Sequence, residues 1–167
     1  MNHDQHQGTH ETHKMPNMHG KHYKHLLIMA ILSFICMYVL MYSMADSFSN
    51  VLPNINQFYM AGLMTMPMIL IEIVVMSGMY MNKKLNALII SVSLVLGAAF
   101  FLFIRQQTGV SDKQFLKGMI PHHAAAILMS EKSKTQDPEI KKLQQEIILS
   151  QNREIELMKA KLKGLEK

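Results

Sequence analysis

The sequence predicts an all-α membrane protein, with three transmembrane helices followed by a helical hairpin outside the membrane. Hydrophobic residues make up 49% of the chain and charged residues 17%, a balance typical of membrane proteins. The apolar residues gather in three long runs, and the C-terminal third alternates apolar and polar residues with a helical period. With 167 residues, the chain is too short for more than one soluble domain of ordinary size.

The three apolar runs cover residues 26–45, 58–81 and 85–104. The first and third contain no Asp, Glu, Lys or Arg, and the second contains one charged residue, Glu72, together with Pro67. About 20 apolar residues in a helix span the hydrocarbon core of a bilayer. The runs therefore predict a three-helix transmembrane domain over residues 26–104.

Basic residues predict the orientation of these spans. Three lysines precede the first run, and Lys83 and Lys84 lie between the second and third, whereas the loop between the first two has none. The positive-inside rule then places the N-terminus in the cytoplasm and residues 105–167 in the periplasm or its equivalent. We interpret the net charge of +5 as a sign of orientation, because the chain lacks the interleaved aromatic and basic residues of nucleic-acid readers.

Residues 1–25 are polar and rich in histidine, which predicts a disordered cytoplasmic tail. Such tracts often bind metal weakly. The histidines that could form this weak site are His3, His6, His10, His13, His19, His22 and His25.

Two helix-capping signals predict the hairpin in residues 105–167. Ser111 followed by Gln114 is typical of a capping box at the start of a first helix. Asp137 followed by Pro138 is typical of the start of a second helix, which should end near Gly164.

Each predicted helix has an apolar stripe that is polar in its middle. The two stripes are Phe115, Met119, His122, Ala126 and Met129 on the first helix, and Ile140, Leu143, Ile147, Gln151, Glu154, Met158 and Leu162 on the second. Buried polar groups are costly unless they are paired or bound to a ligand, and facing helices often build metal sites in this way.

Pro121 lies inside the first predicted helix. An interior proline removes a backbone hydrogen bond and clashes with the preceding turn, so we expect a kink here that reorients His122 and His123. The alternative is that the helix begins at Pro121.

The chain contains 17 methionines and nine histidines. Thioethers select soft ions, and with imidazoles they suit Cu(I) or Ag(I); two imidazoles with a carboxylate would also suit Cu(II) or Zn(II). The candidate ligands are Met119, His122, His123, Met129, Gln151, Glu154 and Met158. The alternatives are that the methionines are flexible apolar filler and that His122 is a core histidine bonded to Glu154. No nucleophile or second carboxylate accompanies these histidines, so we do not expect an enzyme.

A second candidate feature lies in the second run. A possible membrane metal path is formed by Met60, Met64, Met68, Glu72 and Met76. An ionisable residue inside a span suggests function. The alternative is packing methionines with a protonated Glu72 bonded to a neighbour such as Ser91 or Ser93.

The segments "DKQFLKGMIPHHAAAILM" and "IILSQNREIELMKAKL" closely resemble the domain-of-unknown-function family DUF305. The matching residues are Asp112, Phe115, Met119, His122, His123, Ala126, Met129, Gln151, Glu154 and Met158. The resemblance implies a ferritin-like helical fold and copper binding through Met and His, as in the CopM-type periplasmic copper-binding proteins of the family. Many members carry two hairpins in tandem. This chain has one, in what resembles a membrane-anchored single-hairpin form.

We therefore expect a membrane-anchored protein that sequesters or hands over copper, chiefly Cu(I), outside the cytoplasmic membrane, as part of copper tolerance. A homodimer or larger homo-oligomer would complete a four-helix bundle from single hairpins. The alternatives are a metal-transport component that uses the second span, and a structural module that dimerises without metal.

Overall fold

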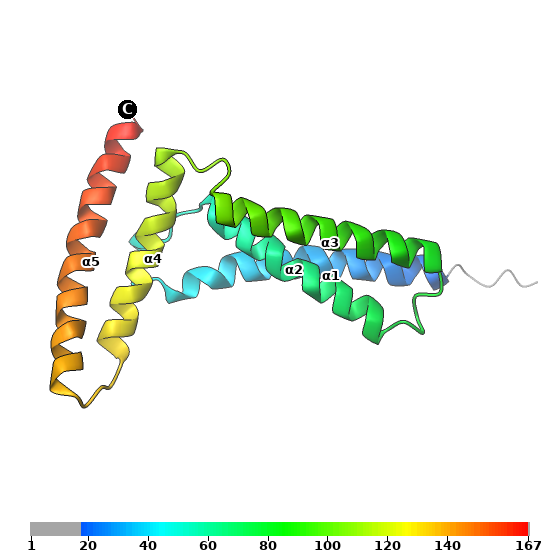
Figure 1. The fold of residues 1–167 in the computed structure, drawn as a ribbon, viewed down its shortest axis with the longest axis horizontal. Helices are drawn as coiled ribbons and strands as arrows, with labels where there is room; N and C mark the ends of the chain where they lie inside the picture. Colours follow the sequence, from blue (N-terminus) through cyan, green and yellow to red (C-terminus); the bar gives the residue numbers. More distant parts are fainter. Residues whose placement is uncertain (1–17, 167) are drawn as a thin grey trace, which may run out of the picture.

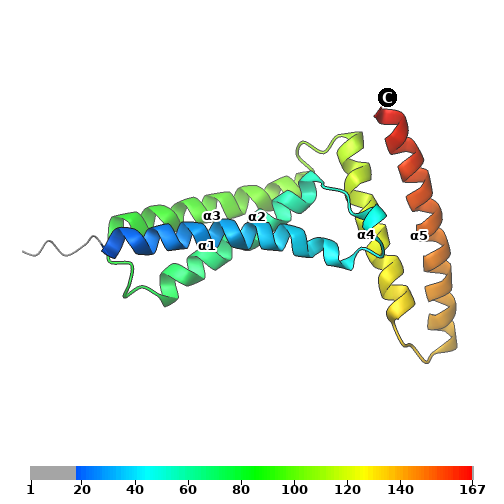
Figure 2. The same ribbon diagram turned by 180° about the vertical axis from the view of Figure 1, so that it is seen from behind.

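The computed structural model describes residues 18–166, and the side chains from residue 20 onward. Its elements are α1 (Met18–Leu40), η1 (Met41–Met44), η2 (Phe48–Asn50), α2 (Ile55–Val75), α3 (Lys83–Gln106), α4 (Asp112–Lys132) and α5 (Pro138–Leu165). Helices α1 to α3 run side by side as an elongated bundle, and the α4–α5 hairpin stands across one end of it (Figures 1 and 2). The predicted all-α fold is confirmed for the described residues.

Three helices are long and apolar enough to cross a membrane, as the sequence predicts. Their bounds differ most from the expected ones at two points, the start of α1 and the end of α2. α1 begins at Met18 instead of residue 26, so the polar residues before the apolar run continue the helix and part of the predicted disordered tail is helical. α2 ends at Val75 instead of residue 81. Met76, Met79 and Met81 are apolar, so hydropathy alone includes them in the span. In the structure they lie in the turn that leads to α3.

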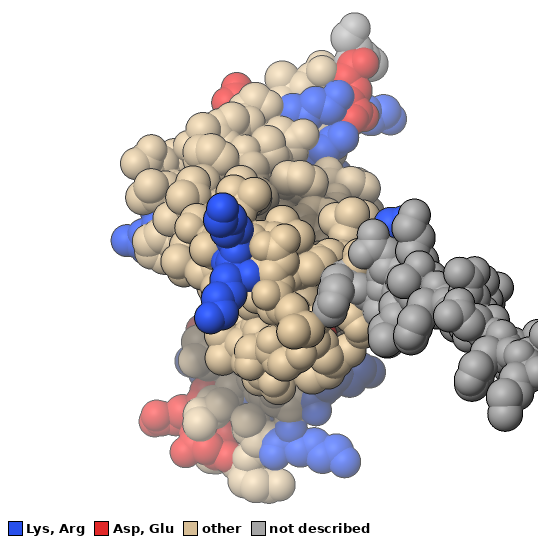
Figure 3. Space-filling view, turned by 90° about the vertical axis from the view of Figure 1, so that its right-hand side faces the viewer, with Lys and Arg blue, Asp and Glu red and all other residues tan. Residues whose placement is uncertain are grey.

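One end of the bundle, where α1 begins and α2 connects to α3, is held by side-chain hydrogen bonds. The Tyr23 hydroxyl donates to Asn86 Oδ1 at 2.7 Å, and Asn86 Nδ2 donates to the Tyr80 carbonyl. We call it the basic end, because the first residues of α1 and α3 include exposed lysines. Figure 3 views the bundle from this end and shows basic side chains in front of an uncharged surface, with acidic ones only above and below, where the hairpin lies.

The opposite end of the bundle, the hairpin end, is tied to the start of α4. Gln114 Oε1 accepts a hydrogen bond from the Ile55 backbone N–H at 3.0 Å. Asn56 Nδ2 donates to Gln107 Oε1, and the Tyr59 hydroxyl donates to the Thr108 carbonyl, both at 3.0 Å. The first bond fixes α4 against the first turn of α2, and the other two fix the connection between α3 and α4 against the same turn.

Both predicted helix caps of the hairpin are confirmed. Ser111 Oγ accepts from the Gln114 N–H, and Asp137 Oδ1 accepts from the N–H groups of Glu139 and Ile140. α4 runs without a break through Pro121, so the alternative that a helix begins there is wrong.

The hairpin core uses a different face of α4 from the one predicted. Its buried residues are Ile120, Ala124 and Ile127 from α4, and Ile155 and Leu162 from α5. Phe115, His122 and Met129, from the predicted stripe, are exposed. The face is shifted by one residue, or about 100° around the helix. Apolar residues surround α4 on all sides, so spacing alone could not select the face that meets α5.

The membrane-length helices pack closely where Gly62 of α2 meets α3. A Cβ atom on Gly62 would lie 2.6 Å from the Phe100 ring, which neighbours the rings of Phe58 and Tyr59. Small residues commonly allow such close approach between membrane helices. The close α2–α3 contact therefore depends on residue 62 being a glycine, which has no side chain.

We predict that Gly62→Ala destabilises the bundle by about 1–3 kcal/mol, because the added methyl group would force the Phe100 ring away from its place beside Phe58 and Tyr59. Thermal unfolding in detergent, followed by circular dichroism, measures the change. Gly97→Ala is the matched control, since its Cβ would meet Met66 at an ordinary 3.5 Å. Equal melting temperatures for the two variants would contradict the prediction.

Candidate metal site

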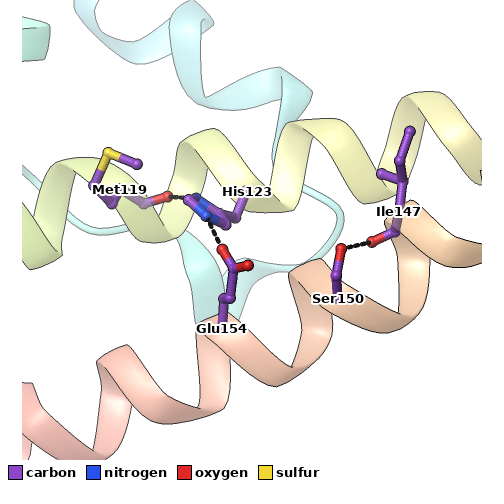
Figure 4. Close-up of polar contacts among 5 residues, drawn as sticks. All are labelled: Met119, His123, Ile147, Ser150 and Glu154. Carbon is purple, nitrogen blue, oxygen red and sulfur yellow. Dashed lines mark hydrogen bonds and ion pairs between the residues drawn. The ribbon is translucent and has the colours of Figure 1, made fainter.

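The two helices of the hairpin are joined by a bridge between the buried His123 of α4 and the half-exposed Glu154 of α5 (Figure 4). His123 is 8% exposed, and its Nε2 lies 2.7 Å from Glu154 Oε2. Its Nδ1 lies 2.9 Å from the carbonyl oxygen of Met119. A carbonyl oxygen can only accept, so Nδ1 carries a proton and Nε2 is the nitrogen that shares a proton with the carboxylate. A backbone acceptor on Nδ1 is the usual way in which a protein orients a histidine to bind metal through Nε2.

His122 and His123 point in different directions. Their ring centroids are 6.0 Å apart at an interplanar angle of 64°, and His122 is exposed. The sulfur of Met119 lies on the side of α4 away from Glu154 (Figure 4). The core histidine bonded to Glu154, which we considered as an alternative at His122, is instead His123. The predicted ligands on α4 therefore lie on two different faces of the helix.

Of the remaining predicted ligands, two lie near Glu154 and one does not. Gln151 and Met158 are half-buried, and they lie three residues before and four residues after Glu154, on the same side of α5. Met158 packs against the hairpin core. Met129 is exposed and lies outside this group. The hairpin interior thus offers one imidazole, one carboxylate, one amide and one thioether.

In the part of the chain that the structure describes, no three His, Cys, Asp or Glu side chains gather as a metal-binding group. Among these residues two imidazoles and one carboxylate do not come together, so the arrangement expected for Cu(II) or Zn(II) does not form within residues 18–166. Thioether ligands, which favour softer ions, are unaffected by this finding.

The methionines of the predicted membrane path lie mainly on an outer face of α2. Met60 and Met64 are exposed, Met68 is half-buried, and Met76 caps the C-terminus of the helix. The three helices of one chain therefore do not enclose a path. Glu72 was expected midway along the span, but α2 ends at Val75 and places it in the last turn.

Glu72 has a partner that the sequence did not suggest. The Tyr80 hydroxyl donates to Glu72 Oε1 at 3.2 Å, in place of the expected Ser91 or Ser93. Burial, and then the charge of Glu72, raise the pKa of the Tyr80 hydroxyl above its ordinary value. Tyr80 lies beyond the end of the helix, and no periodic pattern could have linked it to Glu72.

The histidine-rich tail falls largely outside the described residues. This applies to His3, His6, His10 and His13. His19, His22 and His25 belong to α1, where His22 is half-buried and His25 exposed.

The chain is thus a helical protein with three membrane-length helices and a hairpin that is bridged internally by histidine and glutamate. It belongs to the family described as "Domain of unknown function (DUF305)", whose profile matches residues 72–162. The "Uncharacterized protein L153" of Acanthamoeba polyphaga mimivirus is 38% identical over 136 residues, which cover 80% of this chain and 88% of that protein. No solved structure matches the chain.

We predict that Glu154→Ala destabilises the hairpin by about 1–3 kcal/mol, because it leaves Nε2 of the buried His123 without a partner. Thermal unfolding of the metal-free protein in detergent measures the change. Glu156→Ala serves as control, since Glu156 is exposed and contacts only Lys159 in an ion pair along α5. A loss of stability no larger than in this control would show that the bridge contributes nothing.

Proposed function

We propose that this protein is a membrane-anchored copper-binding protein, which sequesters copper or hands it over outside the cytoplasmic membrane. The observation that carries the proposal is the bridge between the buried His123 and the half-exposed Glu154, with Nδ1 of the imidazole held by a backbone carbonyl. A copper ion would take the place of the proton that Nε2 shares with the carboxylate. Binding itself is the function, and the proposal includes no catalytic step.

Cu(I) is the preferred cargo, and Ag(I) would follow the same chemistry. Met158 lies one turn from Glu154 on the same side of α5, so a thioether can join the imidazole. Gln151 adds a neutral amide oxygen on that side. Because the metal replaces a proton, affinity should fall as the pH is lowered.

The predicted orientation is part of the proposal. The exposed Lys83 and Lys84 and the start of α1 share one end of the bundle, and the hairpin occupies the other (Figure 1). This arrangement agrees with a cytoplasmic basic end and an extracytoplasmic hairpin.

We also propose that two copies pair through the hairpin into a four-helix, ferritin-like bundle of the CopM type. The outer face of α5 carries exposed leucines, including Leu143, Leu149 and Leu157. Apolar residues at these positions suit a helical partner better than water.

The orientation predicts which positions a membrane-impermeant thiol reagent reaches in intact cells. In a Cys36→Ser background, Ser133→Cys at the tip of the hairpin should be labelled, and Gly78→Cys at the basic end only after lysis. Both positions are exposed. Labelling of Gly78→Cys alone in intact cells would reverse the orientation and exclude an extracytoplasmic function.

For the copper site we predict that His123→Leu in the full chain, in detergent, weakens Cu(I) binding by about tenfold or more. Competition with a chromogenic chelator under reducing conditions measures affinity, with excess imidazole to suppress binding to isolated histidines. His25→Leu is the control, because His25 is exposed at the opposite end of the bundle. Unchanged affinity in His123→Leu, together with a higher melting temperature, would indicate a structural hairpin whose core gains from losing a polar group.

A further inference from the structure

A hollow of about 550 Å³ lies between α4 and the hairpin end of the membrane bundle. Three separate segments contribute sulfur or imidazole side chains to its wall. These side chains are Met41 and Met44 from η1, Met60 from α2, and Met119 and His122 from α4. The hollow lies on the face of α4 away from the bridge between His123 and Glu154, so it is a different place from the hairpin interior.

Helix geometry explains why α4 serves both places. Met119 and His122 are three residues apart, so they share a face, whereas the adjacent His123 is turned by about 100°. Figure 4 shows the Met119 side chain directed away from Glu154, while its backbone carbonyl accepts from His123. One turn of α4 thus contributes ligands on two sides.

The chemistry of the hollow is selective. Among the described residues that line it, none carries a formal charge, and the strongest donors are four thioethers and one imidazole. Mg²⁺ and Ca²⁺ take oxygen ligands that usually include carboxylates, and Zn²⁺ prefers thiolate, imidazole and carboxylate. A neutral set rich in thioethers suits a soft monovalent ion.

The wall of the hollow is held in place. The hydrogen bond from Ile55 to Gln114 fixes the start of α2 against α4, and the bond from Asn56 to Gln107 fixes it against the end of α3. The Tyr42 hydroxyl of η1 donates to the Leu52 carbonyl at 3.1 Å. Methionine side chains on such a frame can converge on an ion by rotation alone, because the thioether has three flexible bonds.

One residue in the wall of the hollow has a polar atom with no partner. Asn56 lines the wall, and its Oδ1 is buried and accepts no hydrogen bond within the described structure. A buried acceptor left unpaired is costly, and such atoms are usually satisfied by water or a ligand. The wall of the hollow is therefore not fully satisfied by hydrogen bonds among the described residues.

We propose that this hollow is a second metal site, which takes Cu(I) or Ag(I) through Met41, Met44, Met60, Met119 and His122. The choice of cargo rests on the function proposed above, but the ligands are separate from His123 and Glu154. Met60 is also the first methionine of the row along α2, so the site lies where the hairpin meets the membrane helices. Its position suits transfer of the ion between the two parts of the protein.

The test uses Ag(I), which does not change oxidation state, and the full chain in detergent with excess imidazole. Bound silver is counted by mass spectrometry after desalting, and Cu(I)-loaded protein is examined by X-ray absorption for sulfur ligands. The variant is Met44→Leu with Met60→Leu. The control is Met79→Leu with Met81→Leu, which removes two exposed methionines at the basic end. Leucine nearly conserves volume, and circular dichroism checks the fold of both variants.

We expect the Met44→Leu/Met60→Leu variant to lose about one bound silver ion per chain and the control to lose none. The His123→Leu variant should still bind silver in the hollow, the ion that the Met44→Leu/Met60→Leu variant loses. If silver binding is the same in this variant and the control but falls in His123→Leu, the second site is wrong and the hairpin site stands. If silver binding disappears in the Met44→Leu/Met60→Leu variant and persists in His123→Leu, the second site stands and the hairpin site is wrong. If the wild-type chain binds no silver, both proposals fail.

Discussion

Helix α4 is packed on two sides, and the arrangement of the rest of the molecule depends on this constraint. Ile120, Ala124 and Ile127 belong to the core shared with α5, while Gly118 and Pro121 face the start of α2 and η1. A helix segment that packs on two sides is favoured to be apolar on most of its faces. In the middle of α4, residues 118–129, the two histidines are the only polar side chains: His123 is bonded to Glu154, and His122 lines the hollow.

The cost of burying polar groups explains how the hairpin interior is arranged. An imidazole in an apolar core needs a partner for each ring nitrogen, and here these partners are a backbone carbonyl and a carboxylate from the facing helix. The same contacts hold the ring in one orientation. Stability of the metal-free hairpin and readiness to bind an ion thus depend on the same atoms, because a ligand that is already oriented loses less entropy on binding.

Much of this architecture could be predicted from local signals in the sequence. The three spans follow from hydropathy. The starts of the two hairpin helices follow from the N-caps Ser111 and Asp137, because a cap acts between residues close in sequence. The face of α4 that meets α5 could not be predicted, since its other face packs against helices far away in the chain. The pairing of Tyr80 with Glu72 and the collection of thioethers around the hollow depend in the same way on tertiary packing. The division of the candidate ligands into two groups follows from that packing.

The adjacency of His122 and His123 has a consequence for how this family can change during evolution. Inserting one residue in α4 before His122 would turn the helix that follows by about 100°, so that His122 takes the position of His123 and His123 takes that of Ala124. A deletion would instead move His123 to the position of His122 and His122 to that of Pro121. The five-residue connection between α4 and α5 is mostly exposed and could absorb changes in length at little cost. Selection should therefore hold the length of α4 constant among descendants of this chain, while the connection drifts freely.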